Sequence, residues 1–303
     1  MKPFDFLEPS SISEICSLLS QYNEDAKVIA GGTDLLVSMK KRITTPKYII
    51  GMKHIPNLNH IDYTDTAGVS IGALATLRDI ETSPIIRDRL RILNDTAGKM
   101  ASPAIRNMAT IGGNLCNAAP SADTAPPLIA LGAQAKFMRT KGERTIMLES
   151  FFTGPGKSAL FVDEVLVNIY VPNPPSHTAS TYLKLQRTAV DIAVVGVAVV
   201  ATMDSEHKAI SDVKIVLGAV APTPIRAHKT EEMMRGKDLK EGRWIEKAAQ
   251  TAAEEAKPIT DVRASAEYRR EMVKVLLRHA IKQITVSASL IPPNTNTKEG
   301  HWL

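Results

Sequence analysis

Two short stretches of this sequence share one pattern: 27-KVIAGGTDLL-36 and 109-ATIGGNLCN-117. In each, a strand-like run enters a double glycine, and the first stretch then continues into a helix-like run. Glycine lets a backbone approach a ligand closely and adopt conformations that a Cβ forbids. The free N–H groups of such a turn attract anions. Either stretch alone is compatible with an ordinary structural turn, but the two together predict a pyrophosphate between two loops, and hence a bound dinucleotide.

The composition is that of an ordinary globular protein. The chain has 303 residues, 44% of them hydrophobic and 23% charged, with a net charge of +5. This length suggests two domains at about 100–200 residues each. Basic and acidic residues are interleaved and aromatic residues make up only 5%. A nucleic-acid interface, which needs a one-sign patch or a stacking surface, is therefore not expected.

The sequence also argues against a membrane span and a metal-binding framework. The longest apolar run, residues 192–203, is about half of the roughly 20 residues that cross a bilayer, and the N-terminus has no signal-peptide pattern. The two cysteines, Cys16 and Cys116, lie far apart. They cannot form a disulfide framework or an iron–sulfur ligand set within the chain. We expect a cytoplasmic protein with no metal site of its own.

Short helices and strands alternate around the two loops. Hydrophobic periodicity and capping patterns predict helices over 11–22, 35–42, 76–83, 86–101, 124–133, 243–257 and 265–284. Runs rich in β-branched residues predict strands over 27–30, 47–52, 69–73, 134–139, 144–148, 160–171, 181–187, 191–203 and 212–220. The Pro/Ser-rich stretch 172–180 predicts a domain boundary.

One motif imitates a nucleotide-binding loop. The stretch 154-GPGKSA-159 matches G-x-G-x-x-A and ends like a P-loop. A P-loop needs another glycine where Phe151 stands, and a dinucleotide fingerprint needs a helix where strand-like residues follow. We therefore expect a structural turn here.

The double-glycine loops, with 120-PSADTAPPLIALGA-133 and 150-SFFTGPGKS-158, closely resemble the FAD-binding medium subunits of molybdenum hydroxylases. This family includes bacterial xanthine, carbon monoxide and nicotinate dehydrogenases, and the resemblance covers roughly residues 1–285. A related branch carries an inserted loop with four cysteines for an extra cluster. A chain with two cysteines does not belong to that branch.

The resemblance implies an α+β fold in two domains. Residues 1–175 would form a two-subdomain FAD-binding domain of the PCMH type. Residues 176–285 would form a small α+β domain, of the carbon monoxide dehydrogenase flavoprotein type, with a three-stranded antiparallel sheet and helices. Residues 286–303 would be an extended tail.

The family's FAD contacts fall on two loops and four further positions. The first loop would wrap the pyrophosphate, and the second would close on it from the other subdomain. The implied cofactor-binding residues are Lys27, Val28, Ile29, Ala30, Gly31, Gly32, Thr33, Asp34, Leu35, Ala109, Thr110, Ile111, Gly112, Gly113, Asn114, Ser121, Asp123, Leu166 and Lys184.

Two of these positions also have simpler interpretations. Asp123 matches an acidic residue that bonds the cofactor, but could simply cap the helix expected at 124–133. Lys184 matches a lysine near the isoalloxazine, where a cation stabilises reduced flavin. As a lone lysine in a strand, it could equally be a solvated edge charge.

The resemblance implies an oxidoreductase subunit that transfers electrons through FAD and has no catalytic side chain of its own. Substrate would react at a molybdenum cofactor in a large subunit. Electrons would pass through [2Fe-2S] clusters of a small subunit to this FAD, and then to NAD+ or another acceptor. The assembly would be a dimer of heterotrimers. The alternatives are a self-contained FAD-dependent oxidase of the same fold and a nucleotide-binding scaffold without redox chemistry.

Overall fold

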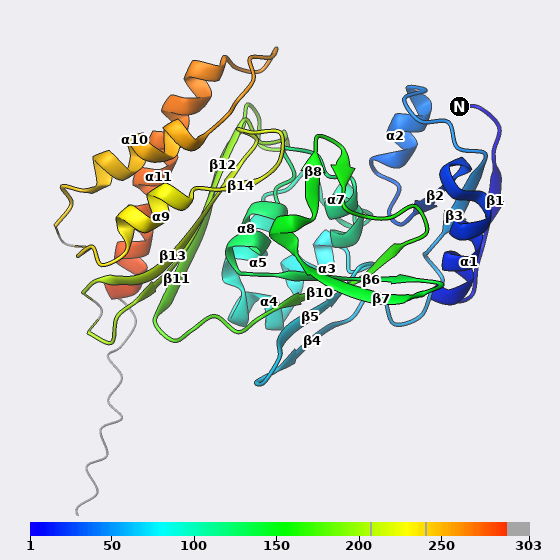
Figure 1. Ribbon diagram of the computed structural model, residues 1–303, viewed down its shortest axis with the longest axis horizontal. Helices are drawn as coiled ribbons and strands as arrows, with labels where there is room; N and C mark the ends of the chain where they lie inside the picture. Colours follow the sequence, from blue (N-terminus) through cyan, green and yellow to red (C-terminus); the bar gives the residue numbers. More distant parts are fainter. Residues whose placement is uncertain (207, 240, 290–303) are drawn as a thin grey trace, which may run out of the picture.

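The structure, a computed structural model, describes residues 1–206, 208–239 and 241–289. Three bodies follow one another along its longest axis (Figure 1). They are a small parallel sheet with two helices, a five-stranded antiparallel sheet with short helices, and a four-stranded sheet with three helices on one face. This mixed α+β architecture confirms the predicted fold class.

The N-terminal body is a three-stranded parallel sheet in the order β1 (Asp5–Leu7), β3 (Tyr48–Gly51), β2 (Ala26–Ile29). Helix α1 (Ile12–Tyr22) packs on it through Ile15, Cys16 and Leu19. The predicted cap is present, because the Ser11 hydroxyl accepts the N–H of Glu14. A short 3-10 turn, η1 (Asn23–Asp25), leads into β2, and the first glycine loop connects β2 to α2 (Leu35–Lys40).

The central body contains the antiparallel sheet β4-β5-β10-β6-β7 and the largest hydrophobic core. Its strands are β4 (Ile61–Thr64), β5 (Gly68–Gly72), β6 (Gln134–Arg139), β7 (Gly142–Met147) and β10 (Val165–Val171). Its helices are α3 (Leu77–Thr82), α4 (Pro84–Arg89), α5 (Arg91–Gly98), α6 (Pro103–Arg106), α7 (Ile111–Cys116) and α8 (Ala125–Ala130). A 3-10 turn, η2 (Leu148–Ser150), precedes the small hairpin β8 (Phe152–Gly154) and β9 (Lys157–Ser158).

The C-terminal body has three long antiparallel strands, as expected, and a two-residue strand at one edge. These are β11 (Thr178–Leu185), β12 (Val195–Met203), β13 (Ile210–Gly218) and β14 (Ile225–Arg226). Helices α9 (His228–Met234), α10 (Ile245–Glu255) and α11 (Ala266–Ser289) cover one face. The other face carries Ala198, Val200 and Val216 into the central core, so both faces of this sheet are buried.

The structure corrects two predicted elements. The helix expected over 86–101 is broken at Leu90, whose φ of −134° and ψ of 53° are not helical; this places the buried Leu90 side chain in the core. The tail expected from residue 286 is helical through Ser289, because α11 continues past the predicted end. Residues 290–303 of that tail lie outside the described residues. No helix in the described ranges is long and apolar enough to span a bilayer.

Candidate functional site

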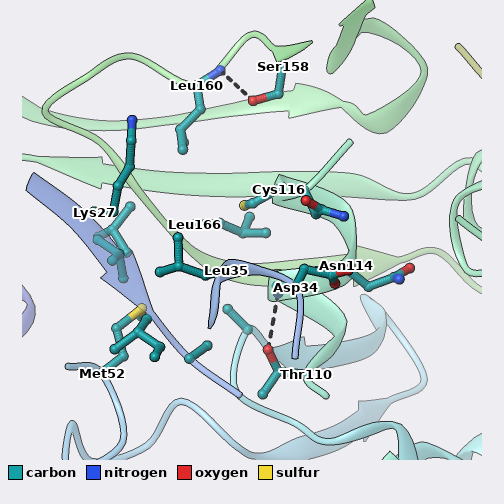
Figure 2. A pocket seen from close by; sticks show the side chains of 18 of the residues that line it. Lys27, Asp34, Leu35, Met52, Thr110, Asn114, Cys116, Ser158, Leu160 and Leu166 are labelled. Atoms are coloured by element: carbon teal, nitrogen blue, oxygen red, sulfur yellow. Dashed lines mark hydrogen bonds between the residues drawn. The ribbon is translucent and has the colours of Figure 1, made fainter. Parts of the chain in front are cut away.

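A cleft of about 850 Å³ lies between the N-terminal and central bodies. Both glycine loops line it, together with β10 and the β8–β9 hairpin. Figure 2 shows Lys27 of β2, with Asp34 and Leu35 at the end of the first loop, around the same cleft as Thr110, Asn114 and Leu166. The volume lies near the upper end of the roughly 300–1,000 Å³ typical of ligand pockets, so the cleft can hold a ligand larger than a mononucleotide.

The first loop presents a series of free backbone donors. Within the described part of the chain, the N–H groups of residues 30–35 donate no hydrogen bond. The turn is possible because Gly32 has a φ of 72°, in the left-handed region that favours glycine. Successive unpaired N–H groups in a turn form a concave anion-binding surface. This part of the cleft therefore suits a phosphate group, as the sequence predicted.

The second loop differs from its prediction. Its double glycine does not follow a strand but forms the first turn of α7, which is capped by the Thr110 hydroxyl. The N–H of Gly112 donates to the carbonyl of Ala73 at 3.0 Å, and that of Gly113 donates to Thr110 Oγ1 at 3.1 Å. Figure 2 shows the latter bond as a dashed line. These two N–H groups are used internally, so they are not the free anion donors that the pattern predicted.

The glycines of the two loops are required by contacts within the protein. A Cβ on Gly31 would lie 1.8 Å from the carbonyl oxygen of Met108, just before the second loop. A Cβ on Gly112 would lie 2.6 Å from the carbonyl oxygen of Ala73. The sequence attributed these glycines to close approach of a ligand. The structure attributes them to close approach of one backbone segment to another, which locks the two loops together.

Most of the predicted binding residues line the cleft. These are Lys27, Val28, Ile29, Ala30, Gly31, Gly32, Thr33, Asp34, Leu35, Ala109, Thr110, Gly112, Gly113, Asn114 and Leu166. Ile111 does not, because its side chain is fully buried in the central core. Ser121, Asp123 and Lys184 also lie outside the cleft lining. The structure therefore brings together the two loops and β10 but separates three predicted positions from them.

Asp123 and Lys184 form a buried cluster of their own at the junction of the central and C-terminal bodies. Lys184 Nζ lies 2.7 Å from Asp123 Oδ2, and the Tyr182 hydroxyl donates to Asp123 Oδ1 at 2.8 Å. The lysine and aspartate side chains are only 6% and 7% exposed. Lys184 is thus neither a solvated edge charge nor a free cation, since its charge is balanced by Asp123.

Burial has the largest effect on the pKa values of Asp123 and Tyr182. It raises the pKa of the Asp123 carboxyl, and the Lys184 ammonium and the Tyr182 hydroxyl oppose that rise. Burial and the neighbouring Asp123 also raise the pKa of Tyr182 well above its ordinary value. Asp123 is followed by Thr124, whose hydroxyl donates to Asn114 Oδ1 at 2.6 Å. This bond connects the cluster to the wall of the cleft.

Sequence reasoning missed one wall of the cleft. Residues Gly156, Lys157 and Ser158 of the β8–β9 hairpin line it, followed by Leu160 and Phe161. The hairpin is the structural turn predicted for 154–159, with Gly156 at a φ of 66°. The resemblance already included 150–158, so that stretch was the available signal that the turn also borders the cofactor site.

The residues present fit a dinucleotide. A glycine loop with N–H groups that have no partner among the described residues suits the pyrophosphate, and the same cleft is also lined by residues of β2, β10 and the β8–β9 hairpin. Two comparisons with family models agree with this geometry. The FAD binding domain in molybdopterin dehydrogenase matches residues 2–174, and the CO dehydrogenase flavoprotein C-terminal domain matches residues 180–284. The chain belongs to this FAD-binding family.

Similar proteins support the same assignment. The carbon monoxide dehydrogenase medium chain of Hydrogenophaga pseudoflava is 34% identical over 281 residues, covering 92% of this chain and 96% of that protein. A putative xanthine dehydrogenase FAD-binding subunit of Escherichia coli is 30% identical over 290 residues, covering 94% and 98%. A chain of reconstituted CO dehydrogenase from Oligotropha carboxidovorans matches with a TM-score of 0.89 at 33% identity, covering 94% and 99%.

The chain is therefore an FAD-binding subunit of a molybdenum hydroxylase-type oxidoreductase. No group of three or more histidine, cysteine, aspartate or glutamate side chains that could hold a metal occurs among the residues that the structure describes.

Cys116 lines the cleft and gives a test of how FAD is held. Burial raises the pKa of its thiol to about 12. The nucleophilic thiolate would then be only about one part in ten thousand at pH 8. We expect non-covalent FAD: acid precipitation should release all the flavin as FAD, and alkylation of Cys116 should stay slow until the pH nears 12. Flavin retained in the pellet, or released as FMN, would contradict this.

Proposed function

We propose that this chain holds FAD across the cleft with the pyrophosphate against the first glycine loop. The six N–H groups of residues 30–35 carry the proposal, because none of them has a partner in the described part of the chain and such a group of donors binds an anion. The second loop closes the site from the other side, with Asn114 directed into the cleft (Figure 2). The adjoining residues of β2 and β10 provide apolar walls that exclude water from the rings.

We further propose that the chain is the electron-transfer subunit of a larger enzyme. FAD, when bound, accepts electrons singly and delivers them in pairs. Electrons would arrive from [2Fe-2S] clusters in a small subunit, after substrate reacts at a molybdenum cofactor in a large subunit. NAD+ is one acceptor that fits, and a cytoplasmic dimer of heterotrimers is the assembly we propose. The names of the similar proteins support the multisubunit arrangement, since several are medium chains.

Within the site, the chain's own residues bind and orient the cofactor. Asp123 and Lys184 stay in the proposal as residues close to the flavin. Their 2.7 Å ion pair means that they present a nearly neutral unit to it, not a free positive charge. Lys184 would stabilise a developing negative charge on the flavin only to the extent that it shifts away from Asp123.

The competing proposal is a self-contained oxidase of the same fold, and the isolated chain distinguishes the two. We expect residues 1–303, reconstituted with FAD, to reduce no dye with purine, nicotinate or aldehyde substrates. We expect them to pass electrons from chemically reduced flavin to artificial acceptors. Substrate-dependent dye reduction by the pure chain would favour the oxidase. Activity that appears only when large and small subunits are added would support the subunit proposal.

A visible spectrum tests the remaining alternative. Flavin absorbance near one equivalent per chain agrees both with an electron-transfer subunit and with a self-contained oxidase. A purified chain that neither carries nor takes up FAD would instead indicate a nucleotide-binding scaffold.

A further inference from the structure

Phe161 is an aromatic residue at the wall of the cleft to which no role has yet been given. It lies in the segment between the β8–β9 hairpin and β10, lines the cleft, and is 49% exposed. A phenylalanine so exposed leaves apolar surface in water, which is unfavourable unless something covers it. The flat face of an aromatic ring is well suited to stacking against another ring.

The Phe161 ring is held in position by a partly buried ion pair, between Arg144 and the fully buried Glu164. The guanidinium carbon of Arg144 lies 4.3 Å from the centre of the ring, and that of Arg139 lies 5.4 Å from it. Both are within the roughly 6 Å at which a cation is attracted to an aromatic face. Arg144 also packs 5.2 Å from the ring centre of Phe137 in the core. The exposed ring is therefore anchored to the interior through a cation.

One carboxylate fixes both the cation and the backbone of this segment. Glu164, whose side chain is fully buried, accepts hydrogen bonds from Arg144 Nε at 2.8 Å and Nη2 at 2.7 Å. Its Oε2 atom also accepts the backbone N–H of Phe161 at 3.1 Å. A bidentate arginine–carboxylate pair is geometrically specific. Phe161 is therefore preorganised at the cleft wall before any ligand binds.

The chemistry of the two ends of the cleft decides which ring Phe161 would meet. The apolar side chains that line the cleft include Val28, Met52 and Leu166, together with Leu160, which directly precedes Phe161 in the chain. In Figure 2, Leu160 lies on the side of Lys27 and Asn114 on the other side, so the segment that contains Leu160 and Phe161 enters the cleft on the Lys27 side. The Asn114 side carries amide groups, Asn117 among them.

These ends suit the two rings of FAD differently. The isoalloxazine has a polar edge whose hydrogen bonds tune its chemistry. Leaving such groups unpaired in an apolar slot is costly. The side-chain amides of Asn114 and Asn117 can provide hydrogen-bond partners for the polar edge of the isoalloxazine. The apolar end, where the Phe161 ring is held in place, suits the stacking of the adenine base.

We propose that Phe161 stacks on the adenine ring of FAD, and that Glu164 and Arg144 are the positioning residues that hold it there. This rests on the proposed function, because it assumes that FAD occupies the cleft. It makes Phe161 a determinant of cofactor specificity: the residue would favour ligands with an adenine end over FMN, which has none.

The test compares FAD, ADP and FMN as ligands of the flavin-free full-length chain by calorimetric titration. Phe161→Ala should weaken FAD and ADP binding by the same factor, roughly tenfold to a hundredfold, as expected for loss of one base–aromatic stack. FMN binding should not change, and Phe161→Trp should restore the affinity for ADP. Unchanged ADP binding, or equal losses for all three ligands, would overturn the proposal.

Two further variants test whether an effect of Phe161→Ala is specific to stacking at the cleft. Phe6→Ala is the matched control, because Phe6 is 53% exposed but belongs to β1 outside the cleft lining; all three affinities should stay as in the wild type. Phe161→Leu keeps apolar packing and should still lose ADP affinity if stacking matters. A wild-type chain that binds neither FAD nor ADP would refute the proposed function itself. Wild-type binding with an unaffected Phe161→Ala variant refutes only the role of Phe161.

Discussion

Gly31→Ala is expected to destabilise the chain by about 3 kcal/mol or more and to yield protein without flavin. The added Cβ would lie 1.8 Å from the carbonyl oxygen of Met108 and 3.1 Å from the Cα of Ala109. Both are backbone atoms, so no side-chain rotation relieves the clash and the two loops must separate. Overpacking in a well-packed interior costs about 1–3 kcal/mol and occasionally more, and here it also distorts the proposed phosphate site. Thermal unfolding and the flavin-to-protein absorbance ratio measure the two effects.

The matched control is another glycine that has room for a Cβ. A Cβ on Gly98, in α5, would meet Glu81 no closer than 3.7 Å, which is ordinary contact. Gly98→Ala should therefore leave flavin content unchanged and stability equal or slightly higher, since alanine favours a helix over glycine. If Gly31→Ala behaves like Gly98→Ala, the two loops are not locked by the contact between Gly31 and Met108.

Lys184→Met is expected to lower stability by about 3–5 kcal/mol, because it leaves the buried Asp123 carboxylate without its counterion. The Tyr182 hydroxyl remains as a hydrogen-bond donor to Asp123, but it carries no compensating charge. At about 2–4 °C per kcal/mol for domains of this size, the unfolding midpoint should fall by roughly 10 °C. Differential scanning calorimetry of the flavin-free chain measures this without contributions from cofactor binding.

An exposed ion pair supplies the comparison for this variant. Lys47 lies 2.8 Å from Asp25, but the two side chains are 69% and 52% exposed. Exposed pairs contribute about 0–1 kcal/mol, so Lys47→Met should shift the midpoint by at most a few degrees. The double variant Asp123→Leu with Lys184→Met should recover part of the loss, because it removes both charges together. Equal effects of Lys184→Met and Lys47→Met would show that burial does not govern the Asp123–Lys184 pair.

The sequence predicted the elements that have a strong local signal. The strand before Gly31, the helix capped by Ser11 and the long strands of the C-terminal sheet all follow from patterns within about ten residues. The stretch at Gly112 was read as a strand entering a turn because its apolar residues precede two glycines. The structure instead starts a helix there, since the Thr110 hydroxyl caps it and the carbonyls of Ala73 and Ala75 pair with its first N–H groups. Those partners are distant in sequence, so no local pattern reveals them.

In the candidate site, too, some features follow from the local sequence and others depend on residues that are distant in the chain. The residues of the first loop could be assigned from their own stretch, but the reason for Gly31 depends on the backbone of Met108. Likewise, Lys184 stands alone in a strand sequence, and its ion pair with Asp123 joins residues that are 61 positions apart. Nothing in the local sequence indicated the position of Phe161, because that position depends on a partly buried ion pair between Arg144 and Glu164, which are 20 residues apart.

The cluster of Asp123, Tyr182 and Lys184 also has a consequence for motion. Asp123 belongs to the central body, whereas Tyr182 and Lys184 belong to β11, so both bonds to Asp123 cross the junction between domains. A further bond across the junction joins the Ala219 N–H to the carbonyl of Pro120 at 2.9 Å. Bending of the C-terminal body away from the central body would expose the Asp123–Lys184 ion pair to water. It would also break the bonds of Asp123 and the Ala219–Pro120 bond at the same time. We therefore expect hydrogen exchange at the junction to be as slow as in the surrounding core, and any movement during turnover to take place in surface loops.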